Sequence, residues 1–477
     1  MLFEPSVYEF LVWYNEMKIA IVGAGISGLS TAQAILSRNP QADIVVFESA
    51  QRVGGKVWTE TSTEGFVCEG GVNGFLDKIP RTLELCKEIG LIPVAANAAA
   101  QRRYVFSQQA LHRLPEKPAE FLTSRLLSVA GRWRVLFETL AGGTDKEDET
   151  LAEFGTRRLG REAFQKLIDP MASGVFAGDA TKMSLKSCFP RIHDLEAEYG
   201  SLIRALVKLQ LKARREGKKN TPGPGPGGRL TSFSDGMGAL TDRLAAVLGS
   251  RIRTASPVVG ISSGGGGYTL HMAHGADEET DVLILAIPAY AQARILREYE
   301  PELACLLDGI EYPALSVVCL GYRKKPDGRY PDGFGFLVPS REQRSILGTI
   351  VDSNVFAGRA PEGTMLLRTM VGGARTPRLA ELPDGQLIDR VRADLRDITG
   401  LSAEPCFSRI FRHEKAIPQY LVGHAARLET ITRVLTRHHG LVLTGNALRG
   451  VSLNDCVVNA WKTAESLVPI AVKGKAA

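Results

Sequence analysis

The chain has 477 residues, 44% hydrophobic and 23% charged, a composition typical of a folded globular protein with two or three domains. No apolar run reaches the roughly 18–20 residues that a membrane-spanning helix needs, so no transmembrane helix is expected. The net charge of +6 is concentrated in residues 101–219, which hold 22 Lys and Arg against 15 Asp and Glu. This basic segment indicates a surface facing anionic lipid or an anionic substrate, although a solvated helical surface explains it equally well.

The first sixteen residues carry three glutamates and no basic residue, which is unlike a signal peptide. Met17 stands directly before the first predicted strand, so residues 1–16 are interpreted as a dispensable extension or a misassigned start. Seven cysteines are scattered without CxxC or His-rich spacing, which predicts neither a disulfide framework nor a metal site. A reducing compartment, the cytoplasm, is therefore expected, and a peripheral position on a membrane stays open.

A glycine-rich turn follows the first apolar run, residues 19–22. In its sequence GAGISG, Gly23 permits a tight turn into a helix, Gly25 lets the main chain approach a pyrophosphate, and Gly28 lets helix and strand pack closely. The first amides of the helix would then face the phosphate charge. Glu48 ends a second apolar strand, twenty residues past the last glycine, and can accept hydrogen bonds from ribose hydroxyls. Together these features predict a dinucleotide site.

The rest of the chain alternates between helical and strand-like segments. Apolar spacing is helical from about residue 81 to 211, and the Pro- and Gly-rich stretch 222–228 predicts a mobile surface loop. Residues 311–375 are rich in β-formers and suggest a sheet, and buried strands are predicted at 281–288 and 440–446. The strands of the nucleotide-binding part are thus separated by insertions, as in a large flavoprotein.

Two features favour FAD over NAD as the dinucleotide. Arg52, followed by Gly54 and Gly55, offers guanidinium and backbone contacts to the pyrophosphate or the flavin side of the ligand. The C-terminal element at Gly445 and Asn446 can close over an extended cofactor. Because no second GxGxxG motif follows, a built-in NAD(P)H site is not expected. The reducing equivalents should come from the organic substrate, with re-oxidation by oxygen or another acceptor.

The glycine motif, Glu48 and the Arg52 motif resemble those of amine oxidases, phytoene desaturases and protoporphyrinogen oxidases. Further signatures narrow the resemblance to the protoporphyrinogen oxidase family, and it runs in order through nearly the whole chain. These signatures are GVFAGD at 174–179, MSLKSCFP at 183–190, EYGSLI at 198–203, GFGFLVP at 333–339, PQYLVGH at 418–424 and GNALRGVSLNDC at 445–456.

The resemblance implies an enzyme that converts protoporphyrinogen IX to protoporphyrin IX in haem synthesis. Six electrons would leave in three two-electron rounds on one noncovalent FAD, and oxygen would become hydrogen peroxide. Three alternatives stay open: a coproporphyrinogen III oxidase of the same family, a related FAD amine oxidase or desaturase, and a noncatalytic flavoprotein that binds a tetrapyrrole. No nucleic-acid partner is expected, whereas membrane association and a homodimer stay open.

The implied fold is α/β, with three interleaved domains. A Rossmann-like FAD-binding domain would comprise residues 17–75, 222–300 and 405–477. A helical domain that is a candidate for membrane binding would comprise residues 76–221. A β-rich substrate domain would comprise residues 301–404.

The resemblance also implies a substrate slot formed by Arg103, Phe334, Gly335, Leu337 and Met370. The arginine would pair with a substrate propionate through two parallel hydrogen bonds, with Arg102 as the neighbouring alternative. An aromatic face can stack on a pyrrole, and a glycine leaves room for a flat macrocycle. The alternative interpretations are a surface arginine, an ordinary buried strand and a methionine that fills the core.

The residues implied to hold FAD follow the same motifs. They are Gly23, Gly25, Ile26, Ser27, Gly28, Glu48, Ser49, Arg52, Gly54, Gly55, Lys56, Gly70, Gly71, Val72, Val258, Gly445, Asn446, Val451, Ser452 and Leu453. Asn454 and Asp455 are alternatively interpreted as caps of the last helix. His424 is interpreted as structural, and no catalytic acid or base is predicted. The context of Cys406 is unlike that of a covalent flavin attachment site.

Overall fold

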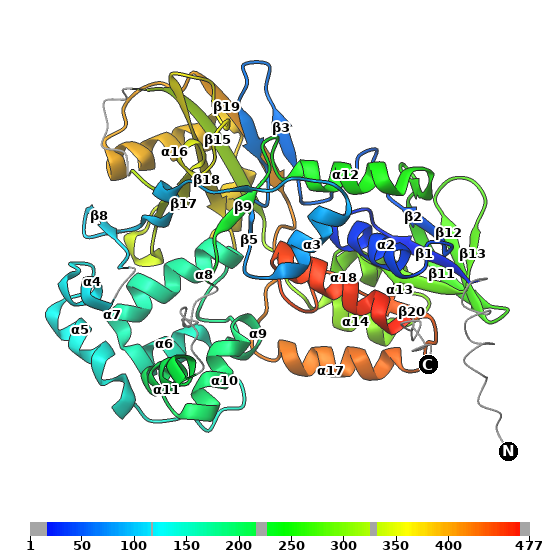
Figure 1. Cartoon of the computed structure of the whole chain (residues 1–477), viewed down its shortest axis with the longest axis horizontal. Coiled ribbons are helices and arrows are strands. Elements are labelled where there is room, and N and C mark those ends of the chain that lie inside the picture. Colours follow the sequence, from blue (N-terminus) through cyan, green and yellow to red (C-terminus); the bar gives the residue numbers. More distant parts are fainter. Residues whose placement is uncertain (1–16, 116–117, 216–226, 325–331, 468–477) are drawn as a thin grey trace.

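The computed structural model describes residues 17–115, 118–215, 227–324 and 332–467. The predicted extension 1–16 lies outside the described residues, and so do residues 222–226 of the predicted loop. Figure 1 shows an α/β layered part on the right, a mixed sheet at the upper left and a group of helices at the lower left.

Five strands form a parallel sheet in the order β10-β2-β1-β14-β20. They are β1 (Lys18–Val22), β2 (Asp43–Phe47), β10 (Ile252–Arg253), β14 (Val282–Leu285) and β20 (Leu441–Leu443). Parallel strands buried on both faces read as continuous apolar runs, which explains the IAIV and VLIL segments. In β1, Ile19 and Ile21 pack into one hydrophobic layer, and Ala20 and Val22 into the opposite one.

Each face of this sheet is covered. One face packs against α2 (Ile26–Arg38), α3 (Pro80–Glu88), α12 (Gly238–Leu248) and α18 (Leu453–Leu467). The other packs against an antiparallel sheet of β11 (Val258–Gly264), β12 (Gly267–Met272) and β13 (Glu278–Thr280), and against α13 (Ala289–Leu296), α14 (Pro301–Asp308) and α17 (His424–Leu435). This arrangement confirms the predicted α/β class with a parallel sheet.

A second, seven-stranded sheet has the order β19-β15-β18-β17-β16-β7-β8. Its strands are β7 (Arg103–Ser107), β8 (Ala110–Arg113), β15 (Leu315–Arg323), β16 (Gly335–Leu337), β17 (Ile346–Val351), β18 (Thr364–Gly372) and β19 (Phe407–His413). Helix α16 (Asp384–Thr399) covers one face, where Leu387 and Val391 pack with Leu320 and Leu367. Neighbouring strands are antiparallel except for the parallel pair of β16 and β7. The other face of the sheet is therefore turned toward the rest of the molecule.

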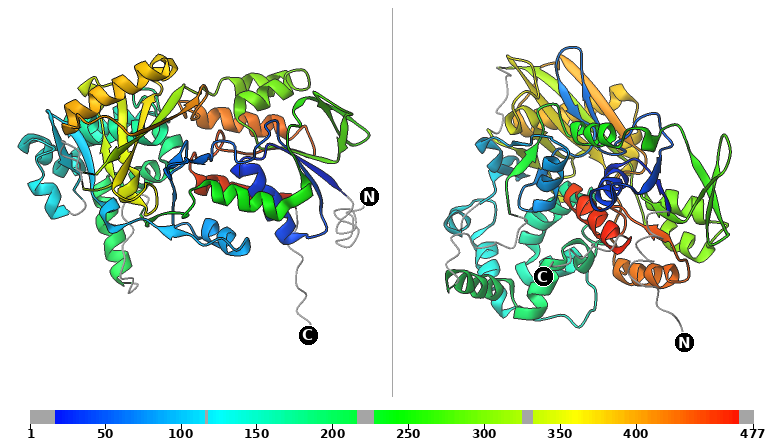
Figure 2. Two further views of the ribbon diagram at one scale, coloured as in Figure 1. Left: turned by 90° about the horizontal axis from the view of Figure 1, so that it is seen from above. Right: turned by 45° about the vertical axis from the view of Figure 1, so that its right-hand side comes forward.

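The helical group lies beside this sheet, as the two views of Figure 2 also show. Its elements are α4 (Pro118–Thr123), α5 (Val129–Leu136), η2 (Phe137–Leu140), α6 (Leu151–Leu159), α7 (Arg161–Ala163), η3 (Phe164–Ile168), α8 (Asp169–Phe176), α9 (Leu185–Cys188), α10 (Pro190–Tyr199) and α11 (Leu202–Arg215). Helix α8 lies against the sheet at Gly174, where an added Cβ would lie 2.7 Å from Leu337 Cδ2. In the described part of the chain, no helix combines the length and apolar character needed to span a bilayer.

Short elements connect these parts. They are β3 (Thr59–Thr61), β4 (Val67–Glu69), β5 (Phe75–Leu76), β6 (Val94–Ala95), β9 (Leu230–Ser232), α15 (Asp352–Val355), η1 (Ala98–Gln101), η4 (Gly249–Arg251), η5 (Ser340–Glu342) and η6 (Pro377–Glu381).

Two segments differ from the sequence-based boundaries. The segment 76–221 was expected to be helical, yet its hairpin β7–β8 joins the seven-stranded sheet. The segment 405–477 was expected in the FAD-binding domain, yet β19 pairs with β15. The hairpin carries no usual turn signal, because Gln108 and Gln109 occupy its positive-φ positions (53° and 61°), where Gly or Asn is typical. The division into three domains stays a prediction.

Candidate functional site

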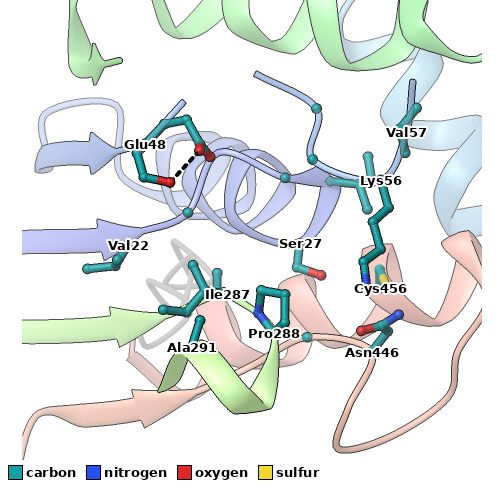
Figure 3. A pocket seen from close by; sticks show the side chains of 18 of the residues that line it. Val22, Ser27, Glu48, Lys56, Val57, Ile287, Pro288, Ala291, Asn446 and Cys456 are labelled. Atoms are coloured by element: carbon teal, nitrogen blue, oxygen red, sulfur yellow. Dashed lines mark hydrogen bonds between the residues drawn. The ribbon is translucent and has the colours of Figure 1, made fainter. Parts of the chain in front are cut away.

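A cavity of about 370 Å³ lies at the carboxyl ends of the parallel strands, where ligands of open α/β sheets bind. Val22 and Phe47 are the last residues of β1 and β2, and Ala286 directly follows β14. Gly445, two residues past β20, closes the cavity from the last strand. Figure 3 shows the cavity from close by.

The glycine turn at 23–28 has the geometry that the sequence motif predicts. Gly23 adopts φ +105°, and Gly28 leaves no room for a side chain, because a Cβ there would lie 1.9 Å from the carbonyl oxygen of Gly23. At Gly25, by contrast, an added Cβ meets nothing within 4 Å, because it would enter the cavity. Helix α2 begins at Ile26 without a side-chain cap, so its first amides are available to an anion. This cradle fits a pyrophosphate.

The Glu48 carboxylate lies at one side of the cavity. Its Oε2 accepts a hydrogen bond from the Ala24 amide at 2.8 Å, and its Oε1 accepts one from the Ala50 amide at 2.9 Å. Oε1 also accepts a hydrogen bond from the Ser49 hydroxyl at 3.3 Å, whereas Oε2 can still accept a second one. Glu48 therefore fixes the turn and can still bind ribose hydroxyls.

Most of the residues predicted to hold the cofactor line this one cavity. They are Gly23, Gly25, Ile26, Ser27, Glu48, Ser49, Gly54, Gly55, Lys56, Val72, Val258, Gly445, Asn446, Val451 and Leu453. The structure thus gathers residues from both ends of the sequence into one site.

Five predicted cofactor residues, Gly28, Arg52, Gly70, Gly71 and Ser452, do not line the cavity. The guanidinium of Arg52 donates to the Gly55 carbonyl at 2.7 Å and stacks on Trp58. It therefore stabilises the turn at Gly54 and Gly55 without lining the cavity. A Cβ at Gly71 would lie 2.1 Å from the carbonyl oxygen of Lys56, so this glycine permits a close backbone approach.

The C-terminal motif divides between capping and packing. The Ser452 hydroxyl accepts a hydrogen bond from the Asp455 amide, and the Asp455 carboxylate accepts one from the Ser452 amide, so Ser452 caps the last helix and Asp455 completes the capping box. Asn454 is buried and instead accepts from the Thr82 hydroxyl and donates to the Leu76 carbonyl. It therefore ties the helix to the segment around α3.

Several lining residues were missed by the sequence analysis. They are Val22, Phe47, Val57, Ser256, Pro257, Ala286, Ile287, Pro288, Tyr290, Ala291, Arg294, Ile295 and Cys456. The strand-to-helix crossing between β14 and α13 supplies many of them, and the proline at the end of that strand was the available signal. Burial raises the pKa of Cys456 to about 11, so this thiol stays protonated.

Lys56 enters the cavity from the side opposite Glu48. Figure 3 shows the two side chains apart, with Ser27 between them and the Lys56 ammonium beside Asn446 and Cys456. The ammonium donates to the Ala416 carbonyl oxygen and lies 4.9 Å from the ring centre of Tyr312. Burial lowers the pKa of Lys56 to about 8.

The predicted substrate residues lie on the second sheet, and none of them lines the cofactor cavity. Arg103 and Gly335 are paired across β7 and β16, and the Arg103 guanidinium lies 5.3 Å from the ring centre of Phe334. Leu337 and Met370 both pair with Gly348 on β17, so they share one row of the sheet.

This row lies near the cofactor cavity. Met370 packs against a small apolar cluster of Ala177, Leu315 and Ala416, and the Ala416 carbonyl accepts the Lys56 hydrogen bond. The sheet face that carries the predicted substrate residues therefore adjoins the Lys56 end of the cavity.

Two buried ion pairs lie behind the segment that carries Gly71. Arg368 faces Asp352 at 3.2 Å and donates to the Gly71 carbonyl at 2.9 Å. Arg359 pairs with Glu69 at 3.1 Å, and both side chains are fully buried. Burial raises the pKa of each carboxyl group, although the neighbouring guanidinium opposes this. The pairs connect the region of the seven-stranded sheet to the cofactor-binding part.

His424 and Cys406 lie apart from the cavity. The His424 ring is buried and stacks on Tyr420 at 4.2 Å, and burial lowers its pKa to about 4. A ring held in this way is neutral at physiological pH, as expected of a structural histidine. Cys406 is exposed, and its thiol is 3.4 Å from the Gly321 carbonyl oxygen.

Comparison with known proteins agrees with this geometry. Residues 26–468 match the flavin-containing amine oxidoreductase family. The chain is 32% identical to protoporphyrinogen oxidase 1 of Arabidopsis thaliana, over 93% of this chain and 86% of the relative. It is 29% identical to coproporphyrinogen III oxidase of Bacillus subtilis, over 92% and 95% of the two chains.

The crystal structure of a protein assigned as a protoporphyrinogen oxidase, from Exiguobacterium sp. 255-15, has a similar fold. It superposes with a TM-score of 0.80 at 28% identity and covers 95% of this chain and 98% of that one. The family match, the similarity over nearly the full chain and the cavity at the glycine turn agree with one another. The chain belongs to the flavin-containing amine oxidoreductase family and is an FAD-dependent oxidoreductase of the branch that includes protoporphyrinogen and coproporphyrinogen III oxidases.

Proposed function

We propose that this chain oxidises protoporphyrinogen IX to protoporphyrin IX with noncovalent FAD. The observation that carries the proposal is the Arg103 guanidinium, which is exposed, lies over the Phe334 ring and has no carboxylate partner among the described residues. An unpaired guanidinium beside an aromatic ring suits a flat substrate that carries a carboxylate. Relatives named as protoporphyrinogen and coproporphyrinogen III oxidases support a porphyrinogen substrate.

FAD would lie in the cavity with its pyrophosphate on the Gly25 turn and its adenosine ribose at Glu48. It would supply a two-electron acceptor, and the chain would bind, orient and exclude water. No side chain in the cavity offers a covalent link of the kind expected from an activated cysteine, because the Cys456 thiol stays protonated. The protonated thiol supports the proposal that FAD is held noncovalently.

The charge around Arg103 favours protoporphyrinogen, with two propionates, over coproporphyrinogen, with four. The neighbouring Arg102 is already paired with Asp332 at 2.7 Å. Arg368, on the same sheet, is committed to Asp352 and to a backbone carbonyl. Of these three arginines, Arg103 alone has no carboxylate partner among the described residues, which suits the substrate with fewer carboxylates.

The test compares both porphyrinogens side by side with the purified, FAD-loaded enzyme. Porphyrin fluorescence and hydrogen peroxide are measured together, with heat-inactivated enzyme as the control for spontaneous oxidation. We expect a higher kcat/KM with protoporphyrinogen IX. A higher kcat/KM with coproporphyrinogen III would assign the alternative substrate, and activity on amines alone would refute porphyrinogen oxidation.

We further propose that the helical group docks on an anionic membrane surface. An apolar ridge formed by Val129, Trp133, Leu136, Phe137 and Leu140 lies on α5 and η2 and is exposed. Trp133 and Phe137 stack at 5.8 Å, and Leu140 is 76% exposed. Exposed apolar patches of this kind mark interaction sites, and aromatic rings favour the membrane interface.

Flotation with vesicles of phosphatidylcholine and phosphatidylglycerol tests this proposal. We expect Trp133→Glu to reduce vesicle binding at least tenfold. The control is Ile92→Glu, because Ile92 is 83% exposed but lies outside the ridge. Equal vesicle binding by both variants would refute the ridge as the docking surface.

A further inference from the structure

The Lys56 ammonium lies in the cofactor cavity and has no carboxylate partner among the described residues. Its partners are the Ala416 carbonyl oxygen and the Tyr312 ring. Withdrawing an ammonium from water is costly unless an opposite charge compensates it. The free protein therefore holds a charge in the cavity that a bound ligand can neutralise.

The position of Lys56 limits which part of the ligand this is. If the ribose hydroxyls of the adenosine lie at Glu48 and the pyrophosphate lies on the turn around Gly25, the remaining half of FAD extends toward Lys56, on the other side of Ser27 (Figure 3). Lys56 also donates to the carbonyl of Ala416, a member of the apolar cluster against which Met370 packs, and Met370 lies on the sheet that carries the predicted substrate residues. With FAD bound in this way, Lys56 would lie where the ring system of the cofactor meets the face that carries the predicted substrate residues.

The charge of that ring system changes during turnover, whereas the charge of the pyrophosphate does not. The oxidised ring is neutral, and it becomes an anion when it has taken up two electrons and one proton from the substrate. An ammonium at this place attracts the reduced form more strongly than the oxidised form. We propose that Lys56 is the counter-charge of the reduced flavin, an inference that rests on the proposed FAD-dependent function.

A second cation of the cavity provides the matched control. Arg294 lies on α13, which packs against β11. The segment leading into β11 contains Ser256, whose amide donates to the Glu48 carbonyl oxygen. Arg294 lines the cavity from a helix that borders the adenosine side, and its removal should affect oxidised and reduced cofactor alike.

The experiment uses the purified holoprotein and requires no porphyrinogen. The variants are Lys56→Met, Lys56→Gln, Lys56→Arg and Arg294→Met. For each, the dissociation constant of oxidised FAD is measured by flavin fluorescence, and the midpoint potential of bound FAD by slow enzymatic reduction with a reference dye. The affinity of bound flavin for sulfite, which also makes the ring anionic, is measured by loss of visible absorbance.

We expect Lys56→Met and Lys56→Gln to weaken sulfite binding at least tenfold. The affinity ratio of reduced to oxidised FAD should fall by a similar factor, and a tenfold change lowers the midpoint potential by about 30 mV. Lys56→Arg and Arg294→Met should keep the wild-type potential.

Two outcomes would overturn the inference. One is an unchanged potential in both neutral variants. The other is a loss of oxidised FAD binding as large as that of reduced FAD, which would assign Lys56 to the pyrophosphate. If instead the wild-type protein binds no FAD, the proposed function itself fails, so the two failures are distinguishable.

Discussion

Two glycines of the same turn should fail in opposite ways when each is replaced by alanine. At Gly28, the new Cβ would lie 1.9 Å from the Gly23 carbonyl oxygen, so helix α2 and strand β1 must separate by more than 1 Å. Overpacking of this kind costs on the order of 1–3 kcal/mol, and we expect the upper end because the Cβ meets a backbone carbonyl, which cannot move aside as a flexible side chain can. At Gly25 the new Cβ meets nothing within 4 Å and only occupies the cavity.

Gly25→Ala should therefore leave the free energy of unfolding of the apoprotein within about 0.5 kcal/mol of wild type. Alanine is a poorer helix cap than glycine, but it also restricts the unfolded chain, and the two effects nearly cancel. Its methyl group would push a pyrophosphate off the helix amides, and we expect the FAD dissociation constant to rise at least tenfold, or about 1.4 kcal/mol.

Urea unfolding of the apoproteins, followed by circular dichroism, and FAD titration, followed by flavin fluorescence, separate these effects. Gly385→Ala on α16 is the control, because its Cβ also points into open space but lies far from the cavity. The reasoning is wrong if Gly25→Ala binds FAD as tightly as wild type, or if it unfolds as readily as Gly28→Ala.

Three further predictions follow from named contacts. Arg103→Met should raise the KM for the porphyrinogen roughly tenfold to a hundredfold and leave the flavin spectrum unchanged. The control is Arg102→Met, which loses only the ion pair with Asp332 and should change the KM less than threefold. Both KM values are measured by steady-state kinetics. His424 stays neutral in the folded protein down to about pH 4, whereas the unfolded chain takes up its proton below about pH 6.5, so stability is lost as the pH falls through this window. The loss is measured as the difference between the free energies of unfolding in urea at pH 7.5 and pH 4.5, and His424→Phe should reduce it by up to about 3 kcal/mol. An equal loss in the wild type and the variant would contradict this expectation. Arg368→Met leaves the Asp352 carboxyl group buried without this partner and should lower the free energy of unfolding, measured with urea, by about 3–5 kcal/mol. A decrease below about 1 kcal/mol would show that the ion pair does not stabilise this region.

The part of the cofactor site formed by the glycine turn and Glu48 could be predicted from short-range sequence patterns. The turn at Gly23 and the acid at Glu48 are neighbours in sequence as well as in space, so their roles can be read from spacing and strand signals alone. The resemblance to a family extended this to the C-terminal residues near Gly445, which no local rule connects to the turn.

What could not be predicted depends on contacts between distant segments. The pairing of Arg103 with Gly335 joins strands more than two hundred residues apart, and the hairpin that carries Arg103 lacks a glycine or asparagine turn. The side chain of Arg52 was expected to face the cofactor, but its direction is decided by stacking on Trp58. The residues of the β14–α13 crossing carry no motif, because apolar lining depends only on shape.

The cavity is completed by residues from both ends of the chain, Gly23 at its beginning and Cys456 near its end. A ribosome must therefore release almost the entire polypeptide before a dinucleotide can be captured, and the first βα unit waits without its ligand throughout synthesis. Since binding to the native state alone adds stability by mass action, a larger supply of FAD at the moment of release would increase the share of newly made protein that survives proteolysis. Flavin availability would then govern the abundance of this oxidoreductase as well as its catalytic rate.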